Sequence, residues 1–186
     1  MIIIGITGTL GAGKGTIVDF LMNKKNFTHF SVRAFVTDEI LKRNLTVNRD
    51  NMVLVANDLR ARHSPSYIVE QLYEQALKSG KNCIIESIRT PGEVDAMKNK
   101  GNFFLFAVDA PAKLRFDRIL QRKSETDNVN FDTFLENEKR EMNSIDPNKQ
   151  NISRCIEMAD YSFKNDGNIE ALEKSVNEII EEILKK

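Results

Sequence analysis

The chain has 186 residues, a length that suits one globular domain. Hydrophobic residues make up 41% of it and charged residues 29%, which is enough for a buried core beneath an ordinary polar surface. Lysine plus arginine and aspartate plus glutamate number 27 each, so the chain lacks the excess of positive charge typical of nucleic-acid-binding and membrane-surface proteins.

Short apolar runs alternate with helical patterns along the chain. Strands are predicted over 2–7, 28–32, 82–87, 102–110 and 161–167. Helices are predicted over 16–24, 33–44, 50–62, 64–80, 111–123 and 131–142 and around the apolar positions between 172 and 183. In the helix over 64–80, Ser64 suits the N-cap, Pro65 the first helical position and Gly80 the residue just past the end. Asp109 is a possible cap for the helix that Pro111 opens.

Apolar strands that alternate with helices indicate parallel pairing, because each crossover needs a helix on one face of the sheet. We therefore predict an α/β fold in three layers, with a parallel sheet of about five strands. One domain spans 1–186, without an internal repeat. The polar stretch over 124–130 and the connection around Pro147 are the least core-like parts, so residues 123–152 could form a mobile flap.

A glycine-rich loop follows the first strand. Its sequence "GTLGAGKG" (8–15) fits the Walker A pattern G-x-x-x-x-G-K, but Gly15 stands where Ser or Thr is usual. Glycines allow successive backbone N–H groups to surround an anion, and the next helix adds its positive N-terminus. Lys14 can then reach the β and γ phosphates of a nucleotide. The alternative interpretation is an ordinary glycine-rich turn with an exposed lysine. We give it little weight, because a strand, spaced glycines, a lysine and a helix follow one another in the order that a phosphate loop requires.

A dinucleotide-binding turn is the other alternative for this loop. It requires three glycines in the pattern G-x-G-x-x-G and an acidic residue at the end of the second strand. A match that starts at Gly11 has Thr16 at the third glycine position, and the second strand ends in Ser-Val-Arg. The sequence therefore favours a mononucleotide phosphate loop.

The stretch "GTLGAGKGT" resembles the loop of adenylate kinase and related nucleoside monophosphate kinases, in which Gly-Thr also follows the lysine. Leu10 departs from the proline that is usual in adenylate kinases. The resemblance implies the P-loop NTPase fold, ATP as phosphoryl donor, and Mg²⁺ held largely through water and the nucleotide, with Thr16 as a possible ligand. The ATP-binding residues that it implies are Gly8, Gly11, Ala12, Gly13, Lys14, Gly15 and Thr16.

The segment "CIIESIRTPGEV" (83–94) places Glu86 at the end of a buried strand and Arg89 three residues later. A carboxylate beside a phosphate loop can order Mg²⁺ through its waters, and an arginine can clamp a phosphate. The segment resembles the "DG-x-(P)R" motif of nucleotide kinases, with Glu86 for Asp and Ser87 for Gly. The ordinary alternative is a Glu86 paired with a local base and a solvated Arg89.

The stretch "HFSVRAFVTDEILKRN" (29–44) occupies the place where nucleotide kinases bind the acceptor monophosphate. The resemblance therefore assigns residues of about 33–80 to acceptor binding, with Ser31 and Arg33 as contacts alongside Arg89. His63 could act as a base, but we assign it no catalytic role, because a phosphate acceptor is already ionised and needs no general base.

Three arginines of the helix after Pro111 share one face, because Arg115, Arg118 and Arg122 fall at i, i+3 and i+7. The ordinary explanation is a solvent-exposed face on which acids such as Asp117 or Glu125 offset the repulsion between the arginines, and we favour this explanation for Arg115. Arg118 and Arg122 resemble the lid-helix arginines of nucleotide kinases, and the resemblance implies that they stabilise the migrating phosphoryl group.

The last strand and turn, "MADYSFKNDG" (158–167), resemble the segment beside the nucleotide base in adenylate-kinase-like and dephospho-coenzyme-A-kinase-like proteins. Asn165 and Asp166 would then shape the base pocket. An ordinary strand-to-helix turn explains the same residues.

The resemblance thus spans most of the chain and points to small adenylate-kinase-related proteins. It implies transfer of the γ-phosphoryl group of MgATP to a small nucleotide, a nucleoside or deoxynucleoside monophosphate. Dephospho-coenzyme A kinase is the second reading, and because its acceptor is a hydroxyl it needs a base, for which Asp38 or Glu39 are available. A nucleotide-sensing switch or slow ATPase is an alternative of another class.

The two cysteines, Cys83 and Cys155, fit neither a metal-binding spacing nor a disulfide framework, so we expect a reducing compartment, the cytoplasm. Four apolar residues precede Gly5, without the features of a signal peptide, and no run approaches the about 20 apolar residues of a membrane span. We expect a small-molecule partner rather than nucleic acid or membrane, and a monomer or a homodimer.

Overall fold

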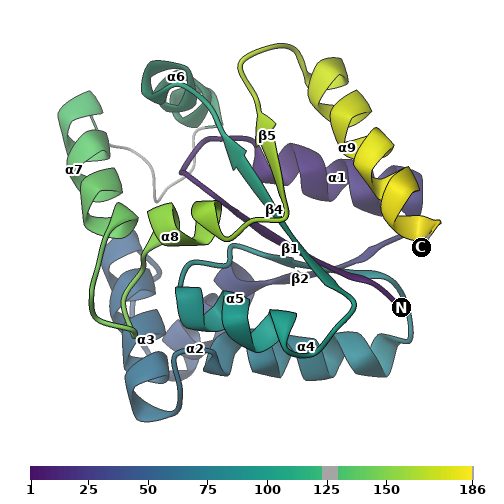
Figure 1. The fold of residues 1–186 in the computed structure, drawn as a ribbon. Helices are drawn as coiled ribbons and strands as arrows, with labels where there is room; N and C mark the ends of the chain where they lie inside the picture. Colours follow the sequence, from purple (N-terminus) through teal and green to yellow (C-terminus); the bar gives the residue numbers. More distant parts are fainter. Residues whose placement is uncertain (123–129, 186) are drawn as a thin grey trace.

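In the part of the chain that the structure describes, five parallel strands form one sheet with helices on both faces (Figure 1). The computed structural model describes residues 1–122 and 130–185. The strands are β1 (Ile3–Gly8), β2 (Thr28–Ser31), β3 (Cys83–Glu86), β4 (Phe103–Asp109) and β5 (Tyr161–Lys164). The helices are α1 (Lys14–Lys25), α2 (Val32–Lys42), α3 (Arg49–Arg62), α4 (Tyr67–Ser79), α5 (Pro91–Lys98), α6 (Ala112–Arg122), α7 (Phe131–Met142), α8 (Ile152–Glu157) and α9 (Ile169–Leu184).

The strand order is β2-β3-β1-β4-β5, so β1 lies at the centre between β3 and β4. Every residue of β1 is buried, as expected for a strand covered on both faces. Ile4 pairs with Ile84 on one side and with Phe104 on the other. The register also sets Ile6 opposite Glu86, which brings the end of β3 beside the glycine-rich loop that follows β1.

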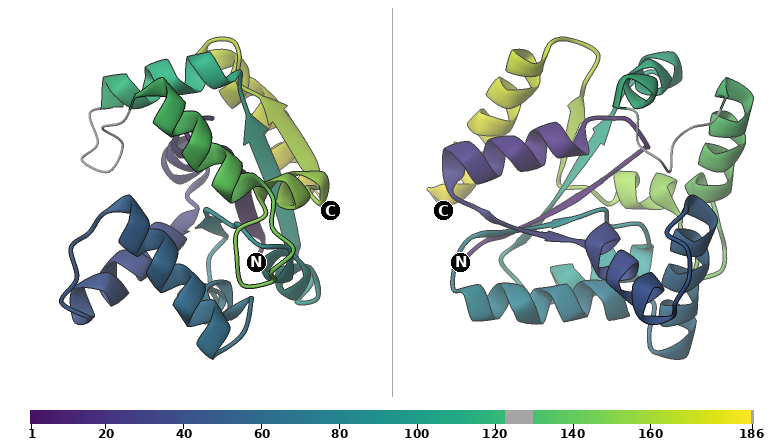
Figure 2. Two further views of the ribbon diagram at one scale, coloured as in Figure 1. Left: turned by 90° about the vertical axis from the view of Figure 1, so that its left-hand side faces the viewer. Right: turned by 180° about the vertical axis from the view of Figure 1, so that it is seen from behind.

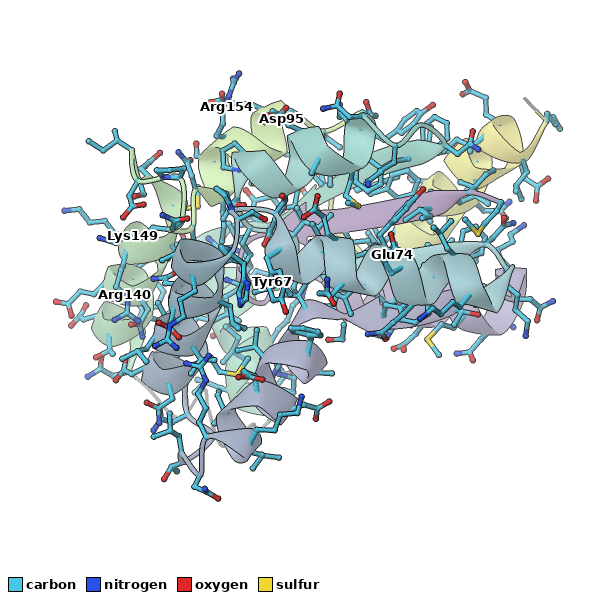
Figure 3. All side chains as sticks on the ribbon, turned by 90° about the horizontal axis from the view of Figure 1, so that it is seen from below. Tyr67, Glu74, Asp95, Arg140, Lys149 and Arg154 are labelled. Carbon is cyan, nitrogen blue, oxygen red and sulfur yellow. The ribbon has the colours of Figure 1, made fainter. Side chains whose placement is uncertain are left out.

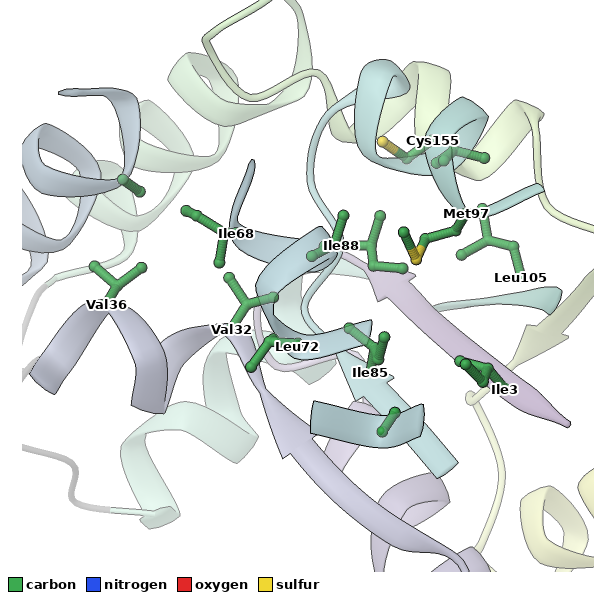
Figure 4. Close-up of a cluster of buried hydrophobic side chains, with 14 of the residues drawn as sticks. Ile3, Val32, Val36, Ile68, Leu72, Ile85, Ile88, Met97, Leu105 and Cys155 are labelled. Carbon is green, nitrogen blue, oxygen red and sulfur yellow. The ribbon is translucent and has the colours of Figure 1, made fainter. Parts of the chain in front are cut away.

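Two apolar clusters hold the layers together. Helices α1 and α9 pack on one face of the sheet, and α4, α5 and α8 cover the other (Figure 2). Charged side chains such as Glu74 and Arg154 project outward from these helices (Figure 3). The cluster under α4, α5 and α8 contains Ile85 and Leu105 of the sheet and Met97 of α5, and it also includes Val36 of α2 (Figure 4). This cluster therefore extends from the sheet to the α2–α3 pair.

The predicted α/β fold with a five-stranded parallel sheet is confirmed, and all five predicted strands are present. The prediction that Ser64 caps the fourth helix is wrong: the carbonyl of Ser64 accepts the N–H of Tyr67 in a turn, and Ser66 is the N-cap. Gly80 ends this helix in the left-handed conformation, as predicted. The side chain of Asp109 accepts the hydroxyl of Thr9, and α6 begins three residues later, at Ala112.

Two short helices, α5 and α8, were not predicted. Helix α5 begins with a capping box, in which Thr90 accepts the N–H of Glu93 and Glu93 accepts the N–H of Thr90, with Pro91 at the first position. Helix α8 begins at the cap Asn151. The turn predicted over 124–130 lies, apart from Asn130, outside the described residues. None of the described helices is long and apolar enough to cross a membrane.

Candidate functional site

A pocket of about 740 Å³ lies at the carboxyl-terminal edge of the sheet. The loop after β1 and the segment after β3 both line it, because parallel strands end at the same edge. The chain continues from β1 into α1 on one face and from β3 into α5 on the other, so the pocket lies at a topological switch point, where α/β sheets bind their ligands. Helices α2, α3, α6 and α7 complete its walls.

The glycines of the loop permit close approaches of the backbone. Gly8, Gly11 and Gly13 all have positive φ, a conformation that other residues rarely adopt. A Cβ atom on Gly13 would lie 2.1 Å from Nδ2 of Asn165, which donates a hydrogen bond to the carbonyl of Ala12. The end of β5 therefore holds the loop in place. Gly11 and Gly13 line the pocket, whereas Ala12 is fully buried behind it.

The ammonium group of Lys14 lies inside the loop. Its Nζ donates hydrogen bonds to the carbonyl oxygens of Gly8 and Thr9, each 2.9 Å long. Burial, with the nearby charge of Arg89, lowers the pKa of Lys14 to about 8. A bound anion beside the ammonium group would stabilise its charged form.

Substitution of Gly8 by alanine is expected to destabilise the fold by at least about 2 kcal/mol. The new Cβ would lie 2.0 Å from the backbone oxygen of Val108 in the neighbouring strand, at a φ of +139°. Gly15→Ala is the matched control: its Cβ would meet nothing within 4 Å, and Gly15 lies in the first turn of α1. Urea unfolding should show a stability for Gly15→Ala equal to or slightly above that of the wild type. A Gly8→Ala protein of wild-type stability would contradict this account.

The carboxylate of Glu86 lies at the end of β3 and lines the pocket. Its Oε2 is 3.3 Å from Nε2 of His29. Burial acts to raise the pKa of Glu86, but His29 and Lys14 together bring that pKa below its usual value, so the group is ionised. Thr16 lines the same pocket. An ionised carboxylate and a hydroxyl are oxygen ligands that suit Mg²⁺, directly or through water.

No cluster of three or more metal-ligating side chains exists among residues 1–122 and 130–185. The groups present therefore fit an ion that is held mainly by a nucleotide's phosphates and by water. They do not fit a site built from protein ligands alone.

The α2–α3 side of the pocket combines charged and apolar residues. Arg33 lines it together with Val36, Met52 and Ala56. Ser31 does not line it: its hydroxyl accepts the N–H of Ala34 and caps α2. The structure therefore brings the predicted Arg33 to the site, and it gives Ser31 a local role at the start of the helix.

Arg89, the second arginine predicted to contact the acceptor, lines the pocket, and it is held by partners that the sequence analysis did not find. Its Nη1 donates to Glu141 Oε2 at 2.8 Å and to Gln150 Oε1 at 2.7 Å. Arg49 Nη2 donates to the other oxygen of Glu141 at 2.6 Å. Burial acts to raise the pKa of Glu141, and Arg89 and Arg49 lower it below the usual value. The carboxylate is therefore ionised.

Arg60 is a further residue of the pocket, to which the sequence analysis assigned no role. It is 1% exposed, and its Nε and Nη2 donate to Glu93 Oε1 at 3.0 and 2.7 Å. Arg60 lies within the helix predicted over 50–62, whereas Arg49 is the first residue of α3 and lies just outside that prediction. The carboxylate partner of Arg49 lies 92 residues away and that of Arg60 lies 33 residues away, so neither pairing carried a local signal.

On the lid side, both predicted arginines, Arg118 and Arg122, line the pocket. Within the described residues Nη1 of Arg118 is buried and has no hydrogen-bond partner, so this N–H can donate to a ligand oxygen. The solvated face favoured for Arg115 is wrong: Arg115 is buried and pairs with Glu138, with Asp109 3.6 Å away.

Asn165 lines the pocket, and its Oδ1 accepts a hydrogen bond from Nη2 of Arg118 at 3.4 Å. Asp166 is exposed and does not line the pocket. Of the carboxylates considered as bases, Asp38 is exposed and Glu39 pairs with Arg43, and neither lines the pocket. Glu125 and the part of the predicted flap over 123–129 lie outside the described residues.

Comparisons with solved structures agree with this fold. Shikimate kinase from Bacteroides thetaiotaomicron superposes with a TM-score of 0.59 at 14% identity, covering 97% of this chain and 98% of that one. Dephospho-CoA kinase from Campylobacter jejuni superposes with a TM-score of 0.55 at 16% identity, covering 98% and 97%. At these identities the similarity shows the fold, which is that of P-loop kinases, as the sequence predicted.

Sequence comparisons give the family. A family described as an AAA domain matches residues 4–146. The UPF0200 protein of Methanococcus vannielii is 30% identical over 187 residues, covering 99% of this chain and 97% of the relative. The UPF0200 protein of Methanococcus maripaludis strain C7 is 33% identical over 188 residues, covering 97% and 98%. On these grounds the chain belongs to the UPF0200 family and carries an AAA domain with the fold of a P-loop kinase.

Proposed function

We propose that the protein transfers the γ-phosphoryl group of MgATP to a small nucleotide, a nucleoside or deoxynucleoside monophosphate. One observation carries this proposal: a single pocket joins the lysine of a phosphate loop to arginines on both sides. Arg33 and Arg89 lie on the α2–α3 side, and Arg118 and Arg122 lie on the other. Arginine is the side chain best suited to bind phosphate oxygens.

In the proposed mechanism the loop N–H groups and Lys14 hold the β and γ phosphates of the donor. Mg²⁺ bound with the nucleotide would neutralise phosphate charge, and Thr16 and Glu86 would hold it, Glu86 through water. Arg33 and Arg89 position the acceptor phosphate. Arg118 and Arg122 stabilise the charge that develops on the transferring group, and no general base is needed because the acceptor is already ionised.

A hydroxyl acceptor, as in dephospho-coenzyme A kinase, is the second candidate, and the structural similarity to such a kinase favours it at the level of the fold. It ranks lower because Asp38 and Glu39, the carboxylates near β2, lie outside the pocket. A slow ATPase or nucleotide-sensing switch ranks third, since it gives no role to the arginines of the acceptor side. The free thiols of Cys83 and Cys155 support a cytoplasmic location.

An acceptor screen tests the proposal. The protein is incubated with MgATP and a panel of nucleoside and deoxynucleoside monophosphates, with dephospho-coenzyme A and shikimate added as hydroxyl acceptors. ADP formation is measured and products are identified by mass. We expect a nucleoside diphosphate product, and its formation should fall at least about tenfold in Arg89→Ala. Tight ATP binding without any phosphorylated product would refute the proposal in favour of the switch.

A further inference from the structure

The carboxylate of Glu141 lies between two arginines of the proposed acceptor side. It comes from the C-terminal turn of α7, whereas Arg49 begins α3 and Arg89 follows β3. In Figure 1 this end of α7 lies next to α3, and the side chains of Glu141 and Arg49 join the two helices. The two oxygens are divided between the arginines, with Oε1 on Arg49 and Oε2 on Arg89. This is the arrangement in which guanidinium groups bind one anionic group of a ligand.

The pair of arginines belongs to the pocket, and so does Glu141. Arg89 and Glu141 both lie close enough to Lys14 to shift its pKa, Arg89 downward and Glu141 upward. The carboxylate is therefore held near the place where the transferring phosphate of the donor would lie. Glu141 is 4% exposed, and a carboxylate so deeply buried is stable only while its cationic partners remain.

We propose that the Glu141 carboxylate occupies the subsite of the acceptor's anionic group. The acceptor's phosphate or carboxylate would displace Glu141 and bind between Arg49 and Arg89, and the displaced side chain would release the C-terminal turn of α7. This inference deepens the proposed function and rests on it only for the identity of the ligand as acceptor. It makes Arg49 a binding residue and Glu141 an internal competitor.

The contacts around Glu141 support exchange rather than a fixed structural pair. Gln150 also accepts from Nη1 of Arg89, and the carbonyl of Arg89 accepts the N–H of Asn151 at 2.9 Å. Arg89 therefore keeps its position when Glu141 leaves. Helix α7 has other anchors: Glu138, three residues before Glu141, pairs with Arg115, and at the N-terminal end Phe131 and Phe134 pack on Phe116. Loss of the Glu141 contacts therefore need not detach the helix.

The test measures binding of inorganic phosphate by calorimetry, with the phosphate loop saturated by a non-hydrolysable ATP analogue and Mg²⁺. The variant Glu141→Gln keeps the shape of the side chain and removes its charge. Glu136→Gln is the matched control, because it removes one charge from an exposed position of the same helix. We expect Glu141→Gln to bind phosphate at least tenfold more tightly than the wild type and Glu136→Gln to bind it as the wild type does. Equal or weaker binding by Glu141→Gln would overturn the proposal.

Hydrogen exchange of the wild type gives a second readout that does not depend on the variant being folded. Saturating phosphate should speed exchange at the C-terminal turn of α7, and unchanged or slower exchange there would overturn the proposal. The same titration is repeated with acetate in place of phosphate. If Glu141→Gln binds acetate more tightly than the wild type does, the subsite takes a carboxylate; if only phosphate is bound more tightly, it takes a phosphate. If the ATP analogue fails to bind, the proposed function fails, and the exchange rate at the C-terminal turn of α7 on addition of phosphate still decides whether Glu141 is displaced.

Discussion

Replacement of Lys14 by alanine is expected to lower kcat for phosphoryl transfer at least about a thousandfold, without unfolding the domain. Lys14 is the cation inside the phosphate loop, where its Nζ donates to the carbonyl oxygens of Gly8 and Thr9. In the transition state its charge would lie against the donor's phosphates, and alanine supplies none. ADP formation with the best acceptor of the screen measures the effect, and near-normal turnover would refute the assignment.

The pH dependence of the free energy of unfolding tests whether the Lys14 ammonium group is buried at a cost in the folded protein. Folding lowers the pKa of this lysine from 10.5 to about 8, so between these values the unfolded chain binds more protons than the folded one. Wild-type stability should therefore rise with pH between about 8 and 10.5, and at pH 7 the buried charge costs up to about 3 kcal/mol. Lys14→Met, which removes the charge, should be more stable than the wild type at pH 7 in urea. It should also lose this pH dependence, and an unchanged slope would show that Lys14 is not its source.

The parts of the site that the sequence predicted are those with local signals. The phosphate loop lies within eight residues, and Glu86 and Arg89 follow one apolar strand, so strand, turn and residue type together indicate their place. The parallel pairing of β1 and β3 then brings these two segments to one edge. Helix α5 could also have been predicted, because Thr90, Pro91 and Glu93 form a recognisable start.

The residues that the sequence did not predict depend on contacts between distant segments. Glu141 meets Arg89 across 52 residues and Arg49 across 92, and no periodicity of either helix relates the three. Arg115 is a residue whose exposure was predicted wrongly for the same reason. Helical spacing placed it on one face with Arg118 and Arg122, but Glu138 buries it against α7, and only the packing of α6 on α7 decides that.

Replacement of Glu93 by glutamine is expected to lower the free energy of unfolding by about 3–5 kcal/mol. Glu93 is fully buried, and its Oε1 accepts from Arg60 while its Oε2 accepts the backbone N–H groups of Arg89 and Thr90. Glutamine has one oxygen, so its amide group would face either the guanidinium or the two N–H groups. The melting temperature should fall by about 10 °C.

A control for this prediction is the exposed pair of Arg154 and Glu157 on α8, whose arginine points outward (Figure 3). Glu157→Gln should change stability by less than about 0.5 kcal/mol, because water screens the pair. The double variant Arg60→Met, Glu93→Gln should be more stable than Glu93→Gln alone, since it removes the buried cation that has lost its counter-charge. If Glu93→Gln proves as harmless as the control, the pair does not hold α3 to the segment after β3. The positions of Arg60 and Arg89 in the pocket would then need another support, because that pair is the direct link between the two.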